Sequence, residues 1–281
     1  MANRFWVGGT GEWNASDTTH WSATTGGAGG ASVPGTSDTV TFNASSGGGT
    51  VTVNTTVAVQ SITCGAFTGT LDFSVNNNNV TLSSSSAFNG SGSGTRTIKL
   101  GNGTWTFTST ASSNSTIWTM ATTTGLTFDA GLSILDFTGV GDSAGQRIFS
   151  GGGLTYSSVR FRGQVNGASL QIIGANSFTT LTNDGPNVIE LSGLTQTIAT
   201  LTINGSPSSP VLMRSSSDGS SRTLSVASNA PTINGAALRD ITGAGGASFV
   251  ANNSFDLGHN SGITINGPAG GHIATRQQLG M

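Results

Sequence analysis

One short pattern, repeated along the chain, decides the fold: Gly103-Thr-Trp-Thr-Phe107. It opens on a glycine and then alternates hydroxyl with large apolar residues, which is the two-residue period of a strand with one buried face. Related stretches are Gly69-Thr-Leu-Asp-Phe73, Gly125-Leu-Thr-Phe-Asp129 and Gly153-Leu-Thr-Tyr156, and Thr180-Leu-Thr182 returns as Thr200-Leu-Thr202. Recurrence after roughly 20–30 residues suits one coil of a β-solenoid, in which each coil buries its inward residues by stacking on its neighbours.

Strand-like runs continue outward from this pattern to both ends of the chain, and each is closed by Gly, Asn or Ser. Sustained helical periodicity is absent from the sequence. We therefore predict an all-β fold, an elongated β-solenoid similar to a right-handed β-helix, with one or two β-sandwiches as the alternative. The expected strands include Val59–Thr63, Val80–Leu82, Leu154–Tyr156 and Ile263–Ile265.

The predicted body of the solenoid spans residues 46–265, and a Gly-rich tail follows at 266–281. Within the body, the run Asn76–Asn79 is expected to form a sharp corner, because asparagine tolerates the left-handed backbone conformation. Asparagine side chains stacked at such a corner can also hydrogen-bond along the axis.

The first segment, residues 1–45, is rich in tryptophan and differs from the body. It holds Trp6, Trp13 and Trp21, three of the five tryptophans. One interpretation is a hydrophobic cap, since the open end of a solenoid is a row of unpaired strand edges. The other is an attachment surface, because tryptophan is enriched where proteins bind one another. Both interpretations stay open at this point.

Charge is scarce, with 10 Lys+Arg and 12 Asp+Glu among 281 residues and a net charge of −2. The single lysine, Lys99, and the dispersed arginines form no cluster that could neutralise phosphates, so no nucleic-acid partner is expected. The abundant Thr, Val and Ile argue against disorder. Neutral polar strands with few charges need covering, which predicts self-association as a homotrimer.

The N-terminus shows no charged region followed by an apolar stretch, so we expect no signal peptide. No run reaches the ~18 apolar residues of a membrane-spanning helix, and no membrane insertion is expected. The one cysteine, Cys64, is expected to be a small buried residue. These features suit a protein made in the host cytoplasm and released in a virion by lysis.

The 12 acidic residues make a carboxylate pair for glycan hydrolysis possible, and two pairs lie near each other in sequence: Asp129 with Asp136 and Asp136 with Asp142. Each lies at a strand end or corner, where aspartate ordinarily shapes the turn. Asp72, between Leu71 and Phe73, is expected on the outer face. We therefore predict no catalytic residues.

The three histidines, His20, His259 and His272, are isolated, and no spacing of His, Cys and Asp fits a zinc site. No metal site and no cofactor are predicted. A structural Ca²⁺ at an Asp/Asn corner is the one metal the composition leaves open.

Three further motifs stand out: Trp6-Val-Gly-Gly-Thr-Gly-x-Trp13, Val33-Pro-x-x-x-Asp38-x-Val-x-Phe42 and Phe255-Asp-x-Gly-x-Asn-x-Gly-Ile-Thr-Ile265. With these motifs the chain resembles phage and bacterial β-helical repeat proteins over nearly its whole length. The resemblance implies phage appendage, capsid-decorating or adhesin proteins, and it carries over no catalytic residue.

The sequence thus predicts a non-enzymatic structural component of a phage virion: a fibre, spike or capsid-decoration protein. Its expected partners are other virion proteins and copies of itself, with a host surface glycan as a further candidate. The alternatives are a tailspike-like glycan depolymerase and a bacterial cell-surface adhesin.

Overall fold

The computed structural model describes residues 2–110, 114–139, 145–162 and 169–269. Over these residues the chain is all-β, as predicted, with long parallel sheets, no α-helix and one 3₁₀ turn, η1 (Ala44–Ser46). Its internal contacts divide it into two compact units. Unit 1 comprises residues 1–109 and 116–135, and unit 2 comprises 110–115 and 136–281.

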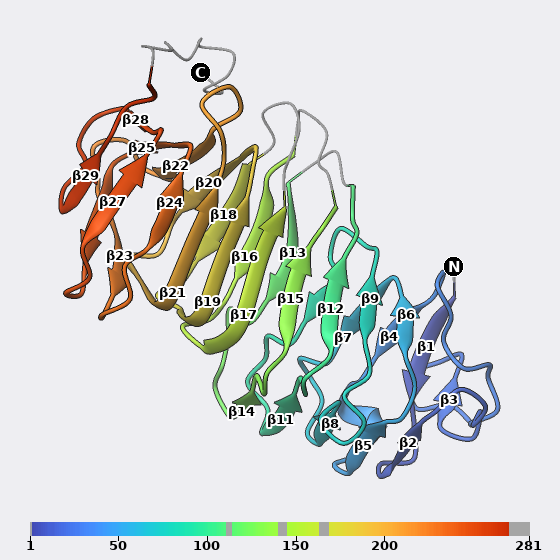
Figure 1. Cartoon of the computed structure of the whole chain (residues 1–281). Helices are drawn as coiled ribbons and strands as arrows, with labels where there is room; N and C mark the ends of the chain where they lie inside the picture. The colour runs from blue at the N-terminus through green and yellow to red at the C-terminus, as the bar shows by residue number, and fades with distance from the viewer. Residues whose placement is uncertain (1, 111–113, 140–144, 163–168, 270–281) are drawn as a thin grey trace. The chain divides into compact units, whose positions relative to one another are not determined.

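Unit 1 is built from three sheets in which each strand pairs with its equivalent from the next repeat (Figure 1). All these pairs are parallel except β1 with β3. The first sheet contains β3 (Trp21–Ser22), β1 (Asn3–Trp6), β4 (Thr39–Thr41), β7 (Ser61–Thr63), β10 (Phe88–Asn89) and β13 (Ser115–Thr119). The second contains β2 (Gly11–Trp13), β5 (Thr50–Val53), β8 (Thr70–Asp72), β11 (Arg96–Lys99) and β14 (Leu126–Asp129). The third contains β6 (Val57–Val59), β9 (Val80–Leu82) and β12 (Thr104–Phe107).

The core of unit 1 consists of apolar columns that follow this register. In the second sheet Val51 pairs with Leu71, Leu71 pairs with Ile98, and all three side chains are fully buried. The alternate positions of the same strands carry the outward column that includes Thr50 and Thr70. The two-residue period of the predicted pattern therefore separates the core from the outer face, as expected for strands with one buried side.

The predicted asparagine corner is confirmed in unit 1. Asn77 has a left-handed backbone (φ 53°). Its Oδ1 accepts a bond from the backbone N–H of Asn102 at 2.7 Å, and Asn102 Oδ1 accepts one from the N–H of Leu132 at 3.0 Å. The side chain of each corner thus satisfies the backbone of the next. Gly131, in the same stack, has φ +55°, and an added Cβ would lie 2.4 Å from the carbonyl oxygen of Gly101.

Unit 2 continues the same parallel pairing in two main sheets. One contains β16 (Arg147–Ser150), β18 (Ser169–Ile173), β20 (Asn187–Leu191), β22 (Val211–Ser215), β25 (Ala236–Arg239) and β28 (Phe255–Asp256). The other contains β17 (Thr155–Arg162), β19 (Ser177–Asp184), β21 (Thr195–Asn204), β24 (Thr232–Asn234), β27 (Phe249–Asn252) and β29 (Ile263–Ile265). β15 (Ile134–Phe137) spans the boundary between the residue ranges of the two units.

The two halves of the long strand β21 pair with different strands of unit 2. Its first half pairs with β23 (Arg222–Val226), which continues to β26 (Ile241–Ala244), whereas its second half pairs with β24. Between the halves, Ala199 and Thr200 are both exposed, so the inside–outside alternation is interrupted there. The first half of β21 and its partner β23 contribute to the groove considered below.

The predicted boundaries fall differently from these units. Residues 1–45 lie within unit 1, and β1 and β4 from this segment already belong to the parallel ladder. The predicted body, 46–265, extends over both units. Of the predicted tail, only residues 266–269 are described.

Cys64 is fully buried in unit 1, as predicted, and burial raises the pKa of its thiol to about 12. Because the thiolate is the reactive form, we expect the native protein to react with Ellman's reagent at about pH 8 at least a hundredfold more slowly than the urea-unfolded protein. Stopped-flow absorbance would measure both rates. Comparable rates would mean that this part of the core opens readily.

Candidate functional site

The three tryptophans predicted as a cap or attachment site lie together inside unit 1. Trp6, Trp13 and Trp21 are at most 1% exposed. The ring of Trp21 meets those of Trp6 and Trp13 edge-on, each at a centroid distance of 5.1 Å, and Phe42 extends the cluster. The side chains therefore form the first layer of the core and present no surface to a partner in this conformation.

Glycines in the same motif make room for this cluster. Gly8 and Gly9 have φ of +89° and +72°, and the Trp6 indole N–H donates to the carbonyl of Gly9 at 2.8 Å. The His20 ring stacks on Trp6 at 4.7 Å, nearly parallel to it. A Cβ on Gly11 would lie 2.4 Å from that imidazole, which explains the glycine at this position.

The strand next to this cluster reverses direction. β3 pairs with β1 antiparallel, with Trp21 opposite Trp6, and is the terminal strand of the first sheet of unit 1. A reversed strand backed by buried rings is one way to cover an edge that would otherwise template further pairing. This geometry agrees with a capping role for residues 1–45, while the role itself stays a prediction.

The acidic residues considered for glycan hydrolysis have structural partners. Asp129, in unit 1, accepts the backbone N–H of Gly131 at 2.9 Å and so shapes a turn, as predicted. Asp136, in unit 2, is 7% exposed and receives two bonds from Arg162, at 2.8 and 2.7 Å. Asp142 lies outside the described residues. Charge-assisted hydrogen bonds of this kind are strong, so the pair of Asp136 and Arg162 stabilises the fold.

Asp72 occupies the outward column but is covered. Its pair residue Lys99, one strand along, places Nζ 3.0 Å from Oδ2, and Ser74 bonds Oδ1. Burial by itself raises the pKa of Asp72, but the bonds from Ser74 and Lys99 prevail, so its pKa lies below the ordinary value. The sequence placed Asp72 on the outer face, and only the register shows that a lysine shields it.

This depressed pKa predicts acid-sensitive stability. A carboxylate with a lowered folded-state pKa adds stability above its unfolded pKa of about 3.9 and loses it as the pH falls through the folded value. We expect Asp72→Asn to cost roughly 1 kcal/mol near neutral pH and progressively less as the pH falls below the unfolded pKa. Urea titrations across this range would show it, with Lys99→Met as the matched variant. A cost that stays constant with pH would refute the assignment.

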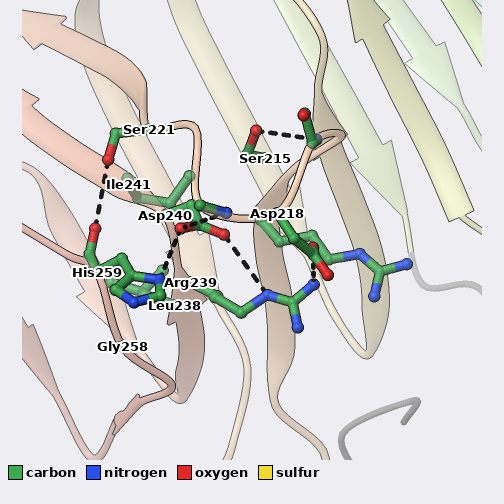
Figure 2. Close-up of polar contacts among 12 residues, drawn as sticks. Ser215, Asp218, Ser221, Leu238, Arg239, Asp240, Ile241, Gly258 and His259 are labelled. Carbon is green, nitrogen blue, oxygen red and sulfur yellow. Dashed lines mark hydrogen bonds and ion pairs between the residues drawn. The ribbon is translucent and has the colours of Figure 1, made fainter.

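A second polar cluster lies at the corner between β25 and β26 in unit 2 (Figure 2). Asp240 is fully buried with φ +57°, and its Oδ1 lies 3.1 Å from His259 Nδ1 and accepts the N–H of Gly219 at 3.2 Å. Arg239 Nε lies 3.7 Å from Oδ2. The carboxylate therefore ties the Gly219 loop to the corner that holds His259.

This cluster contains the residue types of a hydrolase triad without its geometry. The imidazole of His259 contacts Asp240, but the hydroxyl of Ser221 donates to the main-chain carbonyl of His259, at 3.4 Å, rather than to the ring (Figure 2). A nucleophilic serine needs its proton accepted by the base. These contacts join two corners of the fold. The spacing of the residues in the sequence did not predict the contacts.

The histidines, which are possible metal ligands, make other contacts where the structure describes them. His20 stacks on Trp6, His259 pairs with Asp240, and His272 lies outside the described residues. Among the residues that the structure describes, no group of three His, Cys, Asp or Glu side chains could hold a metal ion. The same residues include no helix long and apolar enough to span a bilayer.

None of the family models, curated proteins or solved structures compared with this chain matches it.

Proposed function

We propose that this chain is a β-solenoid of the right-handed β-helix type that serves as a non-enzymatic structural component of a phage virion. The observation that carries the proposal is the in-register parallel ladder within each unit, with apolar columns inside and hydroxyl-bearing columns outside. Such a ladder satisfies its own backbone and stacks repeat on repeat, which suits a stiff scaffold. The alternative of a sandwich would require mainly antiparallel sheets.

Handedness follows from a general rule of topology. A connection between two parallel strands of one sheet is almost always right-handed, because a right-twisted strand packs back onto its sheet only that way. Strands such as β18 and β20 are parallel neighbours joined by one repeat of chain. This supports the right-handed form.

A place on a virion is supported by composition and by the motif resemblance. The surface carries few charges, and its polar groups are mostly hydroxyls and amides. Such faces need a neighbour that covers them, whether a second copy or another virion protein. A homotrimer is the assembly that we propose, and sedimentation at micromolar concentration tests it. A stable monomer would remove the trimer.

Cryo-electron microscopy of the purified particle tests the proposal as a whole. We expect symmetric density into which the strand ladders of both units can be fitted. Mass spectrometry of the same particles should detect the chain in a fixed stoichiometry. Particles without this chain, with all of it free in the lysate, would refute the virion assignment. Cleavage of capsule or lipopolysaccharide by the free protein would then favour the depolymerase.

A further inference from the structure

An open groove of about 250 Å³ crosses the outer face of unit 2 over β17, β19, β21 and β23. Four hydroxyl residues, one from each strand, lie in a single row: Thr155 pairs with Ser177, Ser177 with Thr197, and Thr197 with Ser225. Neighbouring strands are about 4.8 Å apart, so the row offers one hydroxyl per repeat at a regular interval. Thr179 adds a fifth hydroxyl beside it.

These hydroxyls are available to a ligand. Over the described part of the chain, none of the five makes a hydrogen bond to another residue. Thr155, Thr179 and Thr197 are exposed, and Ser177 and Ser225 are half-buried. Many other serines and threonines of the chain shape turns, as Ser74 and Ser215 do. A row of free hydroxyls in a hollow surface therefore differs from ordinary turn chemistry.

The floor between the hydroxyls is apolar. Besides the hydroxyl residues, the groove is lined by the buried Phe178 and Ile198 and by the small residues Ala199, Ala227 and Gly245. None of the described residues that line the groove carries a charge. A hydroxyl both donates and accepts a hydrogen bond. The surface thus complements a neutral molecule that has many hydroxyls along its rim and C–H groups on its faces.

Other classes of ligand fit less well. A peptide added as a strand needs an unpaired edge, but β19 and β21 are paired on both sides. A nucleic acid or an acidic glycan needs cations, which the lining lacks. The groove runs across the strands, so a linear polymer of similar units would meet an equivalent hydroxyl in each repeat.

We propose that this groove binds a neutral linear glycan, which lies across β17, β19, β21 and β23 with its hydroxyls on the row from Thr155 to Ser225. The inference goes beyond the scaffold role, because a rod needs no ligand. It also does not depend on a virion location. Binding by one such groove is expected to be weak, so several copies in an assembly would act together through avidity.

A glycan array that contains neutral and acidic linear oligosaccharides tests the proposal with the full-length protein. Ala199→Trp fills the exposed floor of the groove, and Ala58→Trp makes the same change at a half-buried outward position of β6 in unit 1. We expect neutral glycans to be retained by the wild type and by Ala58→Trp and lost by Ala199→Trp. Circular dichroism and thermal unfolding would establish that both variants fold.

A finer pair of variants tests the hydroxyl row. Thr197→Val removes one hydroxyl from the groove, and Thr202→Val removes one from the same strand outside it. For a neutral glycan identified on the array, we expect the Kd of Thr197→Val to be about fivefold higher, in line with one lost hydrogen bond. We expect the Kd of Thr202→Val to be unchanged. Affinity should not depend on salt concentration, since no charge is involved.

The outcomes that overturn the proposal are distinct from a failure of the virion assignment. Retention of acidic glycans only, or no retention of any neutral glycan, would overturn it, as would equal binding by Ala199→Trp and the wild type. If Ala199→Trp instead abolished self-association measured by sedimentation, the groove would be an interface between copies, and the glycan proposal would be wrong.

Discussion

Replacing Arg96 by methionine is expected to destabilise unit 1 by about 3 kcal/mol, because the carbonyls of the buried Gly90 and the half-buried Gly94 lose their only side-chain donor at ~1–3 kcal/mol each. Arg96 is 2% exposed, although it is charged. Its Nε and Nη2 donate to Gly90 at 3.0 and 2.7 Å, and Nη1 donates to Gly94 at 2.9 Å and to Thr124 at 3.2 Å. A further Nη2 bond reaches Thr122 at 3.0 Å.

The guanidinium therefore uses all five of its N–H donors on main-chain oxygens of two neighbouring turns. Methionine has similar length but no donor. Thr122 keeps the backbone N–H of Gly92 as a partner at 3.0 Å, whereas the carbonyls of Gly90, Gly94 and Thr124 lose the bonds from Arg96. Lysine is no substitute, since an ammonium cannot reproduce the planar fork.

Urea unfolding followed by tryptophan fluorescence would measure this loss. All five tryptophans belong to unit 1, so the signal reports that unit alone. Arg4→Met is the matched control, because Arg4 bonds Ser32 on the surface, and we expect it to cost less than about 1 kcal/mol. If Arg96→Met does not accumulate as soluble protein, Arg96→Gln, which keeps two donors, provides the comparison. A loss below about 1 kcal/mol for Arg96→Met would mean that water replaces the guanidinium.

Arg96 also shows where sequence patterns fail for this chain. The alternation in β11 places residue 96 on the inward face together with Ile98, although a charged residue suggests the outer face. Only the turn carbonyls, brought there by neighbouring repeats, make the inward position favourable. The same holds for Asp240 and His259, whose contact depends on two corners 19 residues apart in sequence.

Strand prediction succeeded where alternation is uninterrupted. Val80–Leu82 and Ile263–Ile265 have the predicted bounds. The predicted strand Val59–Thr63 is instead two strands, β6 and β7, because both Val59 and Ile62 point inward and the phase changes at Gln60. Likewise β17 extends to Arg162, well past the predicted Tyr156, because Ser157 and Ser158, both half-buried, interrupt the alternation without ending the strand. Local periodicity does not reveal corners that the parallel neighbours impose.

The tryptophan cluster leads to the second prediction with a large effect. We expect Trp21→Ala to destabilise unit 1 by about 4 kcal/mol, as is typical when a buried aromatic side chain is removed and leaves a cavity. Trp21 lies at the centre of the cluster, between Trp6 and Trp13, and is fully buried. The variant should therefore lose folding stability rather than a binding surface.

Substitution by phenylalanine separates the ring from its N–H group. Among the described residues, Nε1 of Trp21 has no hydrogen-bond partner, whereas Nε1 of Trp6 donates to Gly9 at 2.8 Å. Trp21→Phe removes an unpaired buried donor, so part of its packing loss is offset. Trp6→Phe removes a made bond as well as packing, and we expect it to cost about 1 kcal/mol more than Trp21→Phe. Fluorescence-detected urea titrations of both variants would give the difference, with four tryptophans left in each as the signal.

These variants also discriminate between the two interpretations of residues 1–45. A cap acts through stability, so assembly of Trp21→Ala into the proposed virion should fall in parallel with its folding, and conditions that stabilise the fold should restore assembly. An attachment surface acts through contact with a neighbour. Trp21→Ala that unfolds at the same urea concentration as the wild type, yet no longer enters the particle, would contradict the buried cluster and support direct attachment. Because all three rings are inaccessible to a partner, the cap is the outcome that we expect.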